Sequence, residues 1–461
     1  MSIPKKVVET LESLSVNYQL VDYSNRLEND SETSLDKTKL LRSVGFKYDS
    51  HNYLAILPYH CLLDYKKLSD VLGFQPSILN EEKLQSLFNG CQENSHPPIN
   101  GLFNIKLFVD PVVLDMDSIY IESGDADQLI QLDKIAANLL FQDCDSLQFS
   151  VSSERLYAGR NSDKSSQDEE VDLSFTPMRL KQRVDETFDL PAMPDIAQDI
   201  MKLRVDPSAD AVKLAQIVSR DPSIAAQVIS WASSPYYGYQ GKIDSIETAI
   251  ARVLGFELVM NLALGISIGK SLKVPKEGPL GVKEFWKQSI YTANLAEKLS
   301  RSMPLKQRPE RGLIYLSGLL HNFGHLLLGH IFPPQFELIN NSVLANPKIA
   351  VEDIEHYILG VTHEEIGAWL MQNWHMPDEL IVAVHHHHQE EFWSKHAVYS
   401  NLVLVANRLL KQLDIGDSVM TSIPDSTLEL LSLDTDTINK ALDDIKMESE
   451  SLDMLANQLV A

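Results

Sequence analysis

Three histidines and an asparagine stand close together in the apolar segment GLLHNFGHLLLGH, residues 318–330. His321 and His325 are four residues apart, so on a helix their imidazoles share one face, a spacing that suits zinc. A metal-dependent hydrolase would carry a carboxylate beside such a histidine, because charged oxygen ligands hold a divalent cation and lower the pKa of a bound water. This chain has Asn322 there, whose neutral amide binds such ions weakly. The segment therefore has the histidines of a metal site without the adjacent charged ligand.

More histidines follow towards the C-terminus. His363 lies in VTHEEIGAWL, and a run of histidines at residues 385–388 lies in VHHHHQ. Successive side chains of a helix point in different directions around its axis, so this run cannot converge on one ion. Because His321 and His325 supply only two ligands, we expect these histidines to be structural or solvent-exposed, with metal binding by some of them as the alternative. The sequence accordingly predicts no resident metal and no other cofactor.

From about residue 181 onward, the elements that carry these residues are predicted to be helices. The pair Asp221-Pro222 is typical of a helix start, because Asp caps the first backbone N–H groups and Pro fits the first helical position. Gly255 is expected to end the helix that precedes it. The apolar segment 255–269 contains Glu257 and is too short to span a bilayer, so it predicts a buried helix.

The first 150 residues indicate a mixture of strands and helices. Short β-like runs occur at residues 53–57 (YLAIL) and 105–110 (IKLFVD), with amphipathic stretches such as LDYKKLSDVLG between them. Residues 151–180 are rich in Ser, Asp and Glu and lack periodicity, which indicates a linker. We therefore predict an α+β domain over residues 1–150, the linker, and an all-α domain over residues 181–461 that ends in packed acidic helices.

The overall charge argues against several classes of partner. With 64 acidic and 40 basic residues, the formal net charge is −24, whereas general binding to nucleic acids or anionic membranes needs clustered Lys and Arg. The three cysteines form no CxxC pair, which fits a reducing compartment. No signal-peptide pattern is visible near the N-terminus. We expect a cytoplasmic protein that does not bind membranes.

The segment 188–264 resembles the HDOD domain, a helical relative of the HD phosphohydrolases. The resemblance rests on LPAMP, IVSRDPSIAAQVISWASSPYYG and SIETAIARVLG, which occur in the family's order and spacing, and it extends over most of residues 183–415. It implies an all-helical fold and a regulatory role in bacterial signalling, without the catalytic site. Within these motifs, Trp231 and the pair Tyr236–Tyr237 are expected to be core and turn-packing aromatics.

The resemblance also implies where the hydrolase metal ligands would stand. The first His falls on Gln288, the His-Asp doublet on His321 and Asn322, and the C-terminal Asp on Asn407. Amides in these places remove most of a hydrolytic site, so we expect no hydrolase activity. Buried amides need partners, and they are expected to bond one another and the histidines, or alternatively a small ligand. The predicted degenerate pocket consists of Gln288, His321, Asn322, His363, His385, His386 and Asn407.

Residues 52–132 are similar to the YbaK/aminoacyl-tRNA-synthetase-associated domain, whose members include deacylases that edit mischarged tRNA. The family's catalytic Lys falls on Arg42, which can hold a phosphate or carboxylate but cannot act as a tunable amine. Asn94 and Asn100 stand where the family has glycines around its pocket, so this site also looks degenerate. The resemblance places the pocket at Lys37, Lys39, Arg42, Pro97, Pro98, Gly101, Asp110 and Gly124.

Two degraded sites in one chain favour a role in binding over a role in catalysis. We expect a non-enzymatic regulatory protein, in which the HDOD module binds a protein partner or small ligand in a signalling pathway and the editing-type domain acts as a sensor. Two alternatives stay open: a metal-dependent phosphohydrolase acting on nucleotides, and a trans-editing deacylase acting on aminoacyl-tRNA. The sequence predicts no particular oligomeric state.

Overall fold

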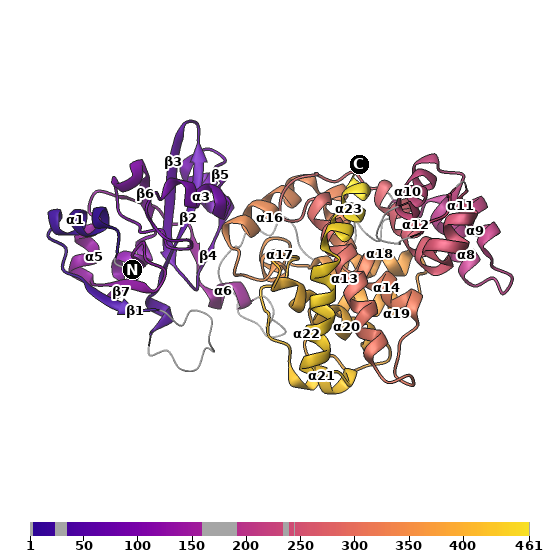
Figure 1. Cartoon of the computed structure of the whole chain (residues 1–461). Helices are drawn as coiled ribbons and strands as arrows, with labels where there is room; N and C mark the ends of the chain where they lie inside the picture. Colours follow the sequence, from indigo (N-terminus) through magenta and orange to yellow (C-terminus); the bar gives the residue numbers. More distant parts are fainter. Residues whose placement is uncertain (1–2, 24–34, 159–190, 234–238, 244, 461) are drawn as a thin grey trace. The chain divides into compact units, whose positions relative to one another are not determined.

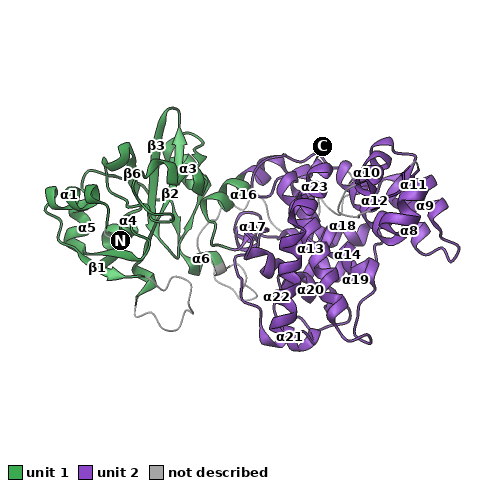
Figure 2. Ribbon diagram, in the orientation of Figure 1, with its two compact units in different colours: residues 1–167, 338–349 green, residues 168–337, 350–461 purple. Residues whose placement is uncertain are grey.

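The computed structural model describes residues 3–23, 35–158, 191–233, 239–243 and 245–460. The chain divides into two compact units, of which unit 1 comprises residues 1–167 and 338–349 and unit 2 comprises residues 168–337 and 350–461 (Figure 2). The division falls inside helix α16, Pro333–Ala345, so a short segment from the C-terminal half of the sequence belongs to unit 1. Most of the predicted linker, residues 159–180, lies outside the described residues.

Unit 1 is an α+β fold, as predicted (Figure 1). Its largest sheet has the strand order β5-β2-β3-β6-β9, in which β2 (Leu41–Tyr48) and β3 (His51–Pro58) pair antiparallel while β6 (Lys106–Val109) runs parallel to β3. The strands predicted at residues 53–57 and 105–110 are therefore confirmed. The other strands are β1 (Gln19–Asp22), β4 (Leu62–Leu63), β5 (Ser77–Ile78), β7 (Ser118–Glu122), β8 (Gln128–Asp133), β9 (Asp145–Ser146) and β10 (Ser150–Val151).

Helices and two 3-10 turns connect these strands. Asp64 accepts a hydrogen bond from Lys67 N and so caps α2, the helix predicted within LDYKKLSDVLG. Asp110 caps α4 in the same way through Val112 N. The elements are α1 (Lys5–Ser13), α2 (Tyr65–Leu72), α3 (Glu81–Leu87), α4 (Pro111–Asp115), α5 (Lys134–Leu140), α6 (Ser153–Ala158), η1 (Lys37–Lys39) and η2 (Leu102–Asn104).

One hydrophobic cluster of unit 1 includes the segment from far along the sequence. Ala345 is fully buried in the cluster that contains Phe46, Leu57 and Leu63, and Leu344 packs against it. Burying such apolar side chains stabilises the fold by about 25 cal/mol per Å². Residues 338–349 are thus part of the core of unit 1.

Unit 2 is helical throughout its described residues, which confirms the predicted fold class. Asp221 caps α10 through the backbone N–H groups of Ser223 and Ile224, and Gly255 adopts a φ of 85° between the π-helical turn η5 and helix α12. The helices are α8 (Asp195–Arg204), α9 (Ala211–Val218), α10 (Pro222–Ala232), α11 (Ile246–Ala249), η5 (Ile250–Leu254), α12 (Phe256–Lys270), α13 (Val282–Ser302), α14 (Arg311–Leu320), α15 (Phe323–Ile331), α17 (Val351–Leu359), α18 (His363–Asn373), α19 (Asp378–His386), α20 (Ala397–Lys411), α21 (Asp425–Leu431), α22 (Thr435–Met447) and α23 (Ser449–Val460).

Helix α13 is the central element of unit 2, because α14, α20, α22 and α23 all pack against it. The acidic C-terminal helices α22 and α23 bury their apolar faces, as predicted, with Leu442 and Leu452 almost fully covered. Trp231 is also fully buried, which confirms it as a core aromatic, whereas Tyr236 and Tyr237 lie outside the described residues. No helix in the described part of the chain has both the length and the apolar character needed to cross a bilayer.

Two glycines allow the helices of unit 2 to approach closely. A Cβ atom at Gly318 of α14 would lie 2.6 Å from Ala293 Cα of α13. A Cβ atom at Gly324 of α15 would lie 1.9 Å from the backbone oxygen of His363, where α18 begins. Backbone atoms cannot move aside as a flexible side chain can, so both positions require glycine.

We predict that Gly324→Ala destabilises the protein even though Ala is the better helix former. The clash with His363 O should lower the free energy of unfolding by about 3 kcal/mol. Gly329→Ala on the same helix is the matched control, because its Cβ would meet side-chain atoms and no backbone: Val274 Cγ1 at 2.7 Å and the Phe336 ring at 3.5 Å. Chemical denaturation measures both variants. Equal losses in the two would contradict the packing described here.

Candidate functional site

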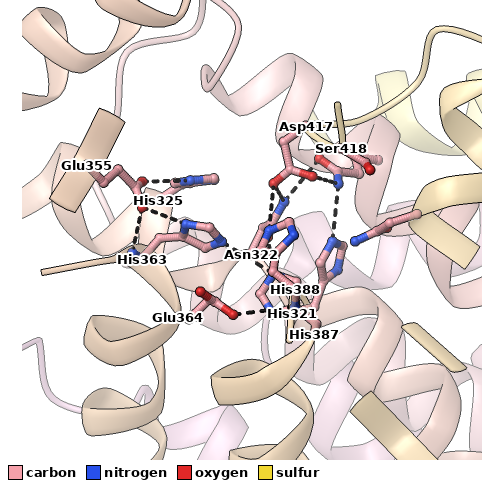
Figure 3. Close-up of polar contacts among 12 residues, drawn as sticks. His321, Asn322, His325, Glu355, His363, Glu364, His387, His388, Asp417 and Ser418 are labelled. Atoms are coloured by element: carbon pink, nitrogen blue, oxygen red, sulfur yellow. Dashed lines mark hydrogen bonds and ion pairs between the residues drawn. The ribbon is translucent and has the colours of Figure 1, made fainter. Parts of the chain in front are cut away.

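The polar site of unit 2 is built at the junction of α14 and α15 (Figure 3). His321 follows the last residue of α14, and Asn322 precedes the first residue of α15. The close approach at Gly318 brings both beside Gln288 of α13, and all three side chains are buried. Sequence positions that the HDOD resemblance aligns with metal ligands thus lie together in the structure.

An acid from another part of the chain, Asp417, completes this site (Figure 3). Its Oδ1 accepts a hydrogen bond from Gln288 Nε2 at 2.6 Å, and its Oδ2 accepts one from Asn322 Nδ2 at 2.8 Å. Asn322 Nδ2 also donates to Gln288 Oε1 at 3.0 Å. The neighbouring Gly416 has a φ of 95° and approaches Gln288 so closely that a Cβ would lie 2.9 Å from Nε2. The two amides therefore hold a carboxylate supplied by the loop after α20.

The hydrogen bonds of His321 define it as a neutral imidazole. Its Nδ1 lies 2.7 Å from Gly318 O, which can only accept, so Nδ1 carries the proton. Its Nε2 then accepts a hydrogen bond from Gln288 Nε2 at 3.3 Å. Burial lowers the pKa of His321 to about 4, although Asp417 opposes this shift. His321 is therefore a neutral acceptor near pH 7.

His388 supplies positive charge to the site. Its Nε2 lies 3.6 Å from Asp417 Oδ2, and its backbone N–H donates to Glu364 Oε1 at 3.4 Å. Burial by itself lowers the pKa of His388, but Glu352 and Asp417 outweigh it and raise the pKa to about 10. Burial likewise raises the pKa of Asp417, yet His388 holds it well below the usual range of a carboxyl group. Asp417 and His388 form a buried ion pair.

A second acidic centre, Glu355, lies beside the first. Glu355 Oε2 accepts the backbone N–H of His363 at 2.8 Å and lies 2.7 Å from His363 Nδ1, while Oε1 lies 3.0 Å from His325 Nε2. Burial raises the pKa of Glu355, but His363 and His325 outweigh it and lower the pKa to about 2. His387 connects the two centres, because its Nε2 lies 3.3 Å from His363 Nε2 and 3.0 Å from Asn322 Oδ1.

Two groups in the described part of the chain have the composition and spacing to hold a metal ion. One consists of His363, His387 and His388, and the other of His325, Glu355 and His363. In each, the candidate ligand atoms lie within 4.8 Å of one another. Neither group contains Asn322 or Gln288, so the amides of the predicted pocket take no part in either group.

Three residues of the predicted pocket make no hydrogen bond to Gln288, His321 or Asn322 in the described part of the chain. His385 is exposed, and His386 stacks on Phe392. Instead, it is His387 and His388, which follow the last residue of α19, whose side chains point inward. Asn407 is buried, but its Oδ1 accepts from Thr292 Oγ1 at 2.8 Å and its Nδ2 has no hydrogen-bond partner. The prediction is corrected accordingly, whereas Gln288, His321, Asn322 and His363 do lie within one connected network.

Sequence reasoning missed Asp417, Glu355 and His388 as members of the site. Asp417 and Glu355 lie in no motif that resembles a ligand pattern, and His388 was grouped with its neighbours. One signal could have found Asp417. Two buried amides oriented as donors require an acceptor, and the pair Gly416-Asp417 is typical of a tight turn that presents a carboxylate.

In unit 1, Arg42 binds the chain itself. Its Nη1 donates to Ala345 O at 2.8 Å, and its Nη2 donates to Cys61 O at 3.1 Å and to Asn346 Oδ1. Asn346 in turn bridges Leu63, accepting from its backbone N at 2.8 Å and donating to its backbone O at 3.0 Å. The guanidinium in the place of the family's lysine therefore serves to hold residues 345–346.

The other predicted residues of the editing-like pocket have mainly structural surroundings. Asp110 caps α4 and accepts from Phe149 N and Ser150 N at 2.9 and 2.7 Å. Lys39 is paired with Asp36 at 3.6 Å, at the end of the turn η1 that also contains Lys37. Pro97 and Pro98 are buried, Gly101 has a φ of 74°, and Gly124 has a φ of 89°. These residues shape the loops of unit 1.

The chemistry available to the site of unit 2 depends on what the carboxylate of Asp417 already binds. Asp417 already accepts hydrogen bonds from two amides and is paired with His388, so its oxygens are committed. A hydrolytic HD site instead needs free carboxylates to hold cations that activate water. The amides of Gln288 and Asn322 therefore bind an anion, and that anion is the carboxylate of Asp417 from the same chain.

Comparison with known proteins agrees with these features. Residues 190–390 match the HDOD domain, and residues 28–135 match the aminoacyl-tRNA editing domain. The chain is similar over 100% of both lengths, with 31% identity and a TM-score of 0.81, to the crystal structure of a protein from Marinobacter aquaeolei VT8 named for signal transduction. An HDOD domain protein of unknown function from Geobacter sulfurreducens, with 20% identity, a TM-score of 0.51 and coverage of 60% of this chain and 96% of that one, shows the fold alone.

A curated relative covers the chain only in part. An uncharacterized protein of Treponema pallidum (strain Nichols) is 23% identical over 256 residues, which are 55% of this chain and 48% of that protein. The chain thus spans about half the length of the curated relative that it matches.

His388→Gln should destabilise the protein in a pH-dependent way, because it leaves Asp417 buried without its cation. Because the pKa of His388 is raised, its contribution to the free energy of unfolding is fully present below the ordinary histidine pKa of about 6.5. That contribution is lost as pH rises through about 10. The lowered pKa of Asp417 means that its contribution is lost as pH falls below about 4. We expect a loss of about 3–5 kcal/mol between about pH 4 and 6.5, shrinking towards pH 10.

Urea denaturation across this pH range measures the effect of His388→Gln. The exposed His385→Gln, three residues earlier near the end of α19, is the control and should change stability little at any pH. A loss in His388→Gln that is the same at pH 5 and pH 10 would contradict the ion pair.

Asn346→Ala should destabilise unit 1, because it removes the partner of both backbone groups of Leu63 and one partner of Arg42. Unsatisfied buried groups of this kind cost about 1–3 kcal/mol each, and we expect a loss of about 3 kcal/mol in the free energy of unfolding. Lys348→Ala, two residues away, removes a contact 4.9 Å above the Tyr59 ring and an electrostatic interaction with Glu81, and should cost less than about 1 kcal/mol. Thermal denaturation compares the two, and equal effects would argue against the role of Asn346.

Proposed function

Since the chain belongs to the HDOD family and carries an aminoacyl-tRNA editing domain ahead of its HDOD domain, we propose that it is a non-catalytic signalling protein whose HDOD domain binds a protein partner. The observation that carries the proposal is the buried carboxylate of Asp417, held by Gln288 and Asn322 in the pocket where the related hydrolases bind metal. A pocket filled by its own chain suits a stable binding module, because nothing in it is left open for a substrate.

The N-terminal domain takes the part of a non-catalytic sensor in this proposal. Arg42 stands at the position of the editing family's lysine, and its guanidinium is engaged by the backbone of Ala345 and by Asn346. Burial lowers the pKa of Arg42 only to about 10, so it stays cationic at neutral pH and cannot act as a base. The net charge of −24 also offers no broad surface for tRNA.

Activity assays test the non-catalytic part of the proposal. The wild-type chain supplied with Mn²⁺ or Mg²⁺ should not turn over a panel of nucleotides and cyclic dinucleotides, and it should not release amino acid from mischarged tRNA. Turnover of a nucleotide would support a phosphohydrolase instead. Deacylation that is lost on the triple change of Lys37, Lys39 and Arg42 to Ala would support a trans-editing enzyme.

The binding part is tested by affinity purification of the tagged chain from its native cell. A partner of the HDOD domain should be recovered with wild type and with Asn346→Ala, which disturbs unit 1, but not with Gly324→Ala, which disturbs the packing of unit 2. Recovery that depends on Asn346 and not on Gly324 would move the binding role to the editing-type domain. Recovery of no partner with any of the chains would refute it.

Asn322→Asp tests the occupied pocket directly, because it places a second carboxylate against Asp417 Oδ2, which is 2.8 Å from Asn322 Nδ2. Two adjacent buried carboxylates cannot both ionise, so the pKa of one is raised and its charged form destabilises the fold. We expect stability about 2–4 kcal/mol below wild type at pH 8, with the deficit shrinking as pH falls towards 4.

The control is the double variant Asn322→Asp, Asp417→Asn, which exchanges the carboxylate and the amide and so restores a donor–acceptor pair. It should recover much of the stability at pH 8 in guanidinium denaturation. If Asn322→Asp alone is as stable as wild type at pH 8, Asp417 does not occupy this pocket.

A further inference from the structure

Three helices contribute one buried side chain each to a cluster beside the occupied pocket: His325 of α15, Glu355 of α17 and His363 of α18. The Glu355 and His363 side chains are 0% exposed, and that of His325 is 3% exposed. Their candidate ligand atoms lie within 4.8 Å of one another (Figure 3). The cluster is formed entirely by groups that a transition-metal ion can use as ligands.

Two atoms of this cluster face each other without a hydrogen bond. His325 Nε2 and Glu355 Oε1 are 3.0 Å apart as a buried ion pair, and neither atom has a hydrogen bond of good geometry. Two ligands of a tetrahedral ion, each about 2.0–2.1 Å from it, lie about 3.3 Å apart, and each points at the ion and not at the other ligand. The 3.0 Å separation of His325 Nε2 and Glu355 Oε1 is close to that distance.

The other oxygen of Glu355 is oriented by the protein. Oε2 accepts the backbone N–H of His363 at 2.8 Å, which holds the carboxylate in place from the start of α18. Ligands that are positioned by such outer contacts bind metal ions more tightly. A buried carboxylate also needs a compensating positive charge, which a divalent cation would provide.

We propose that His325, Glu355 and His363 bind one divalent transition-metal ion. The donor set of two imidazoles and one carboxylate suits zinc, a borderline ion that accepts both nitrogen and oxygen ligands. The ion ties α15, α17 and α18 together. The site is distinct from the positions at Gln288, Asn322 and Asn407, and it does not depend on the proposed signalling function.

The test uses the full chain, stripped with EDTA and then titrated with Zn²⁺ or Co²⁺. Wild type should bind one ion per chain, and Co²⁺ should give the intense visible absorption of a four-coordinate site. His325→Gln and Glu355→Gln should weaken binding more than about tenfold. His356→Gln is the matched control, because it removes an imidazole next to Glu355 in sequence but outside the cluster.

Each result decides the proposal. Absence of binding by wild type overturns it, and so does binding that survives Glu355→Gln but is lost in His388→Gln, which would place the ion at His363, His387 and His388. If the variants fail to fold, X-ray absorption spectroscopy of the wild-type zinc complex replaces them. Two imidazoles and a carboxylate around the ion support the site, and three imidazoles refute it.

Discussion

The contact between Asp417 and the amides of Gln288 and Asn322 is the interaction on which the polar interior of unit 2 depends. A buried carboxylate is stable only with donors and a compensating charge, and buried amide N–H groups are stable only with acceptors. Each side of this contact therefore requires the other. Amides at the hydrolase ligand positions and an acid in the loop after α20 form one consistent polar arrangement, with His388 supplying the positive charge.

The remaining histidines are arranged around this contact according to their protonation. His321 is neutral and accepts from Gln288, while His388 is charged and pairs with Asp417. The helices that carry these groups pack closely, because α14 and α15 approach their neighbours at Gly318 and Gly324, where any side chain would meet backbone atoms. In unit 2, close helix packing and the buried hydrogen bonds therefore occur in the same region.

Unit 1 shows the same principle with different residues. Arg42 is a permanent cation that binds the carbonyl groups of Ala345 and Cys61 and the side chain of Asn346. A guanidinium presents five N–H donors in a rigid planar fork, whereas an ammonium is a compact charge with three donors. Arg42 is therefore part of the internal structure of unit 1.

The sequence by itself determined the local elements and the chemical character of the site. Asp221-Pro222 predicted a helix start, residues 53–57 a strand, and the buried amides hydrogen bonds to one another and to a histidine, because these depend on side-chain chemistry and short-range periodicity. Only the tertiary structure decided that His388 enters the site while His385 does not, and that Asp417 meets Asn322 across 95 residues. Such contacts depend on how helices pack and turn against one another, and local sequence carries no record of that packing.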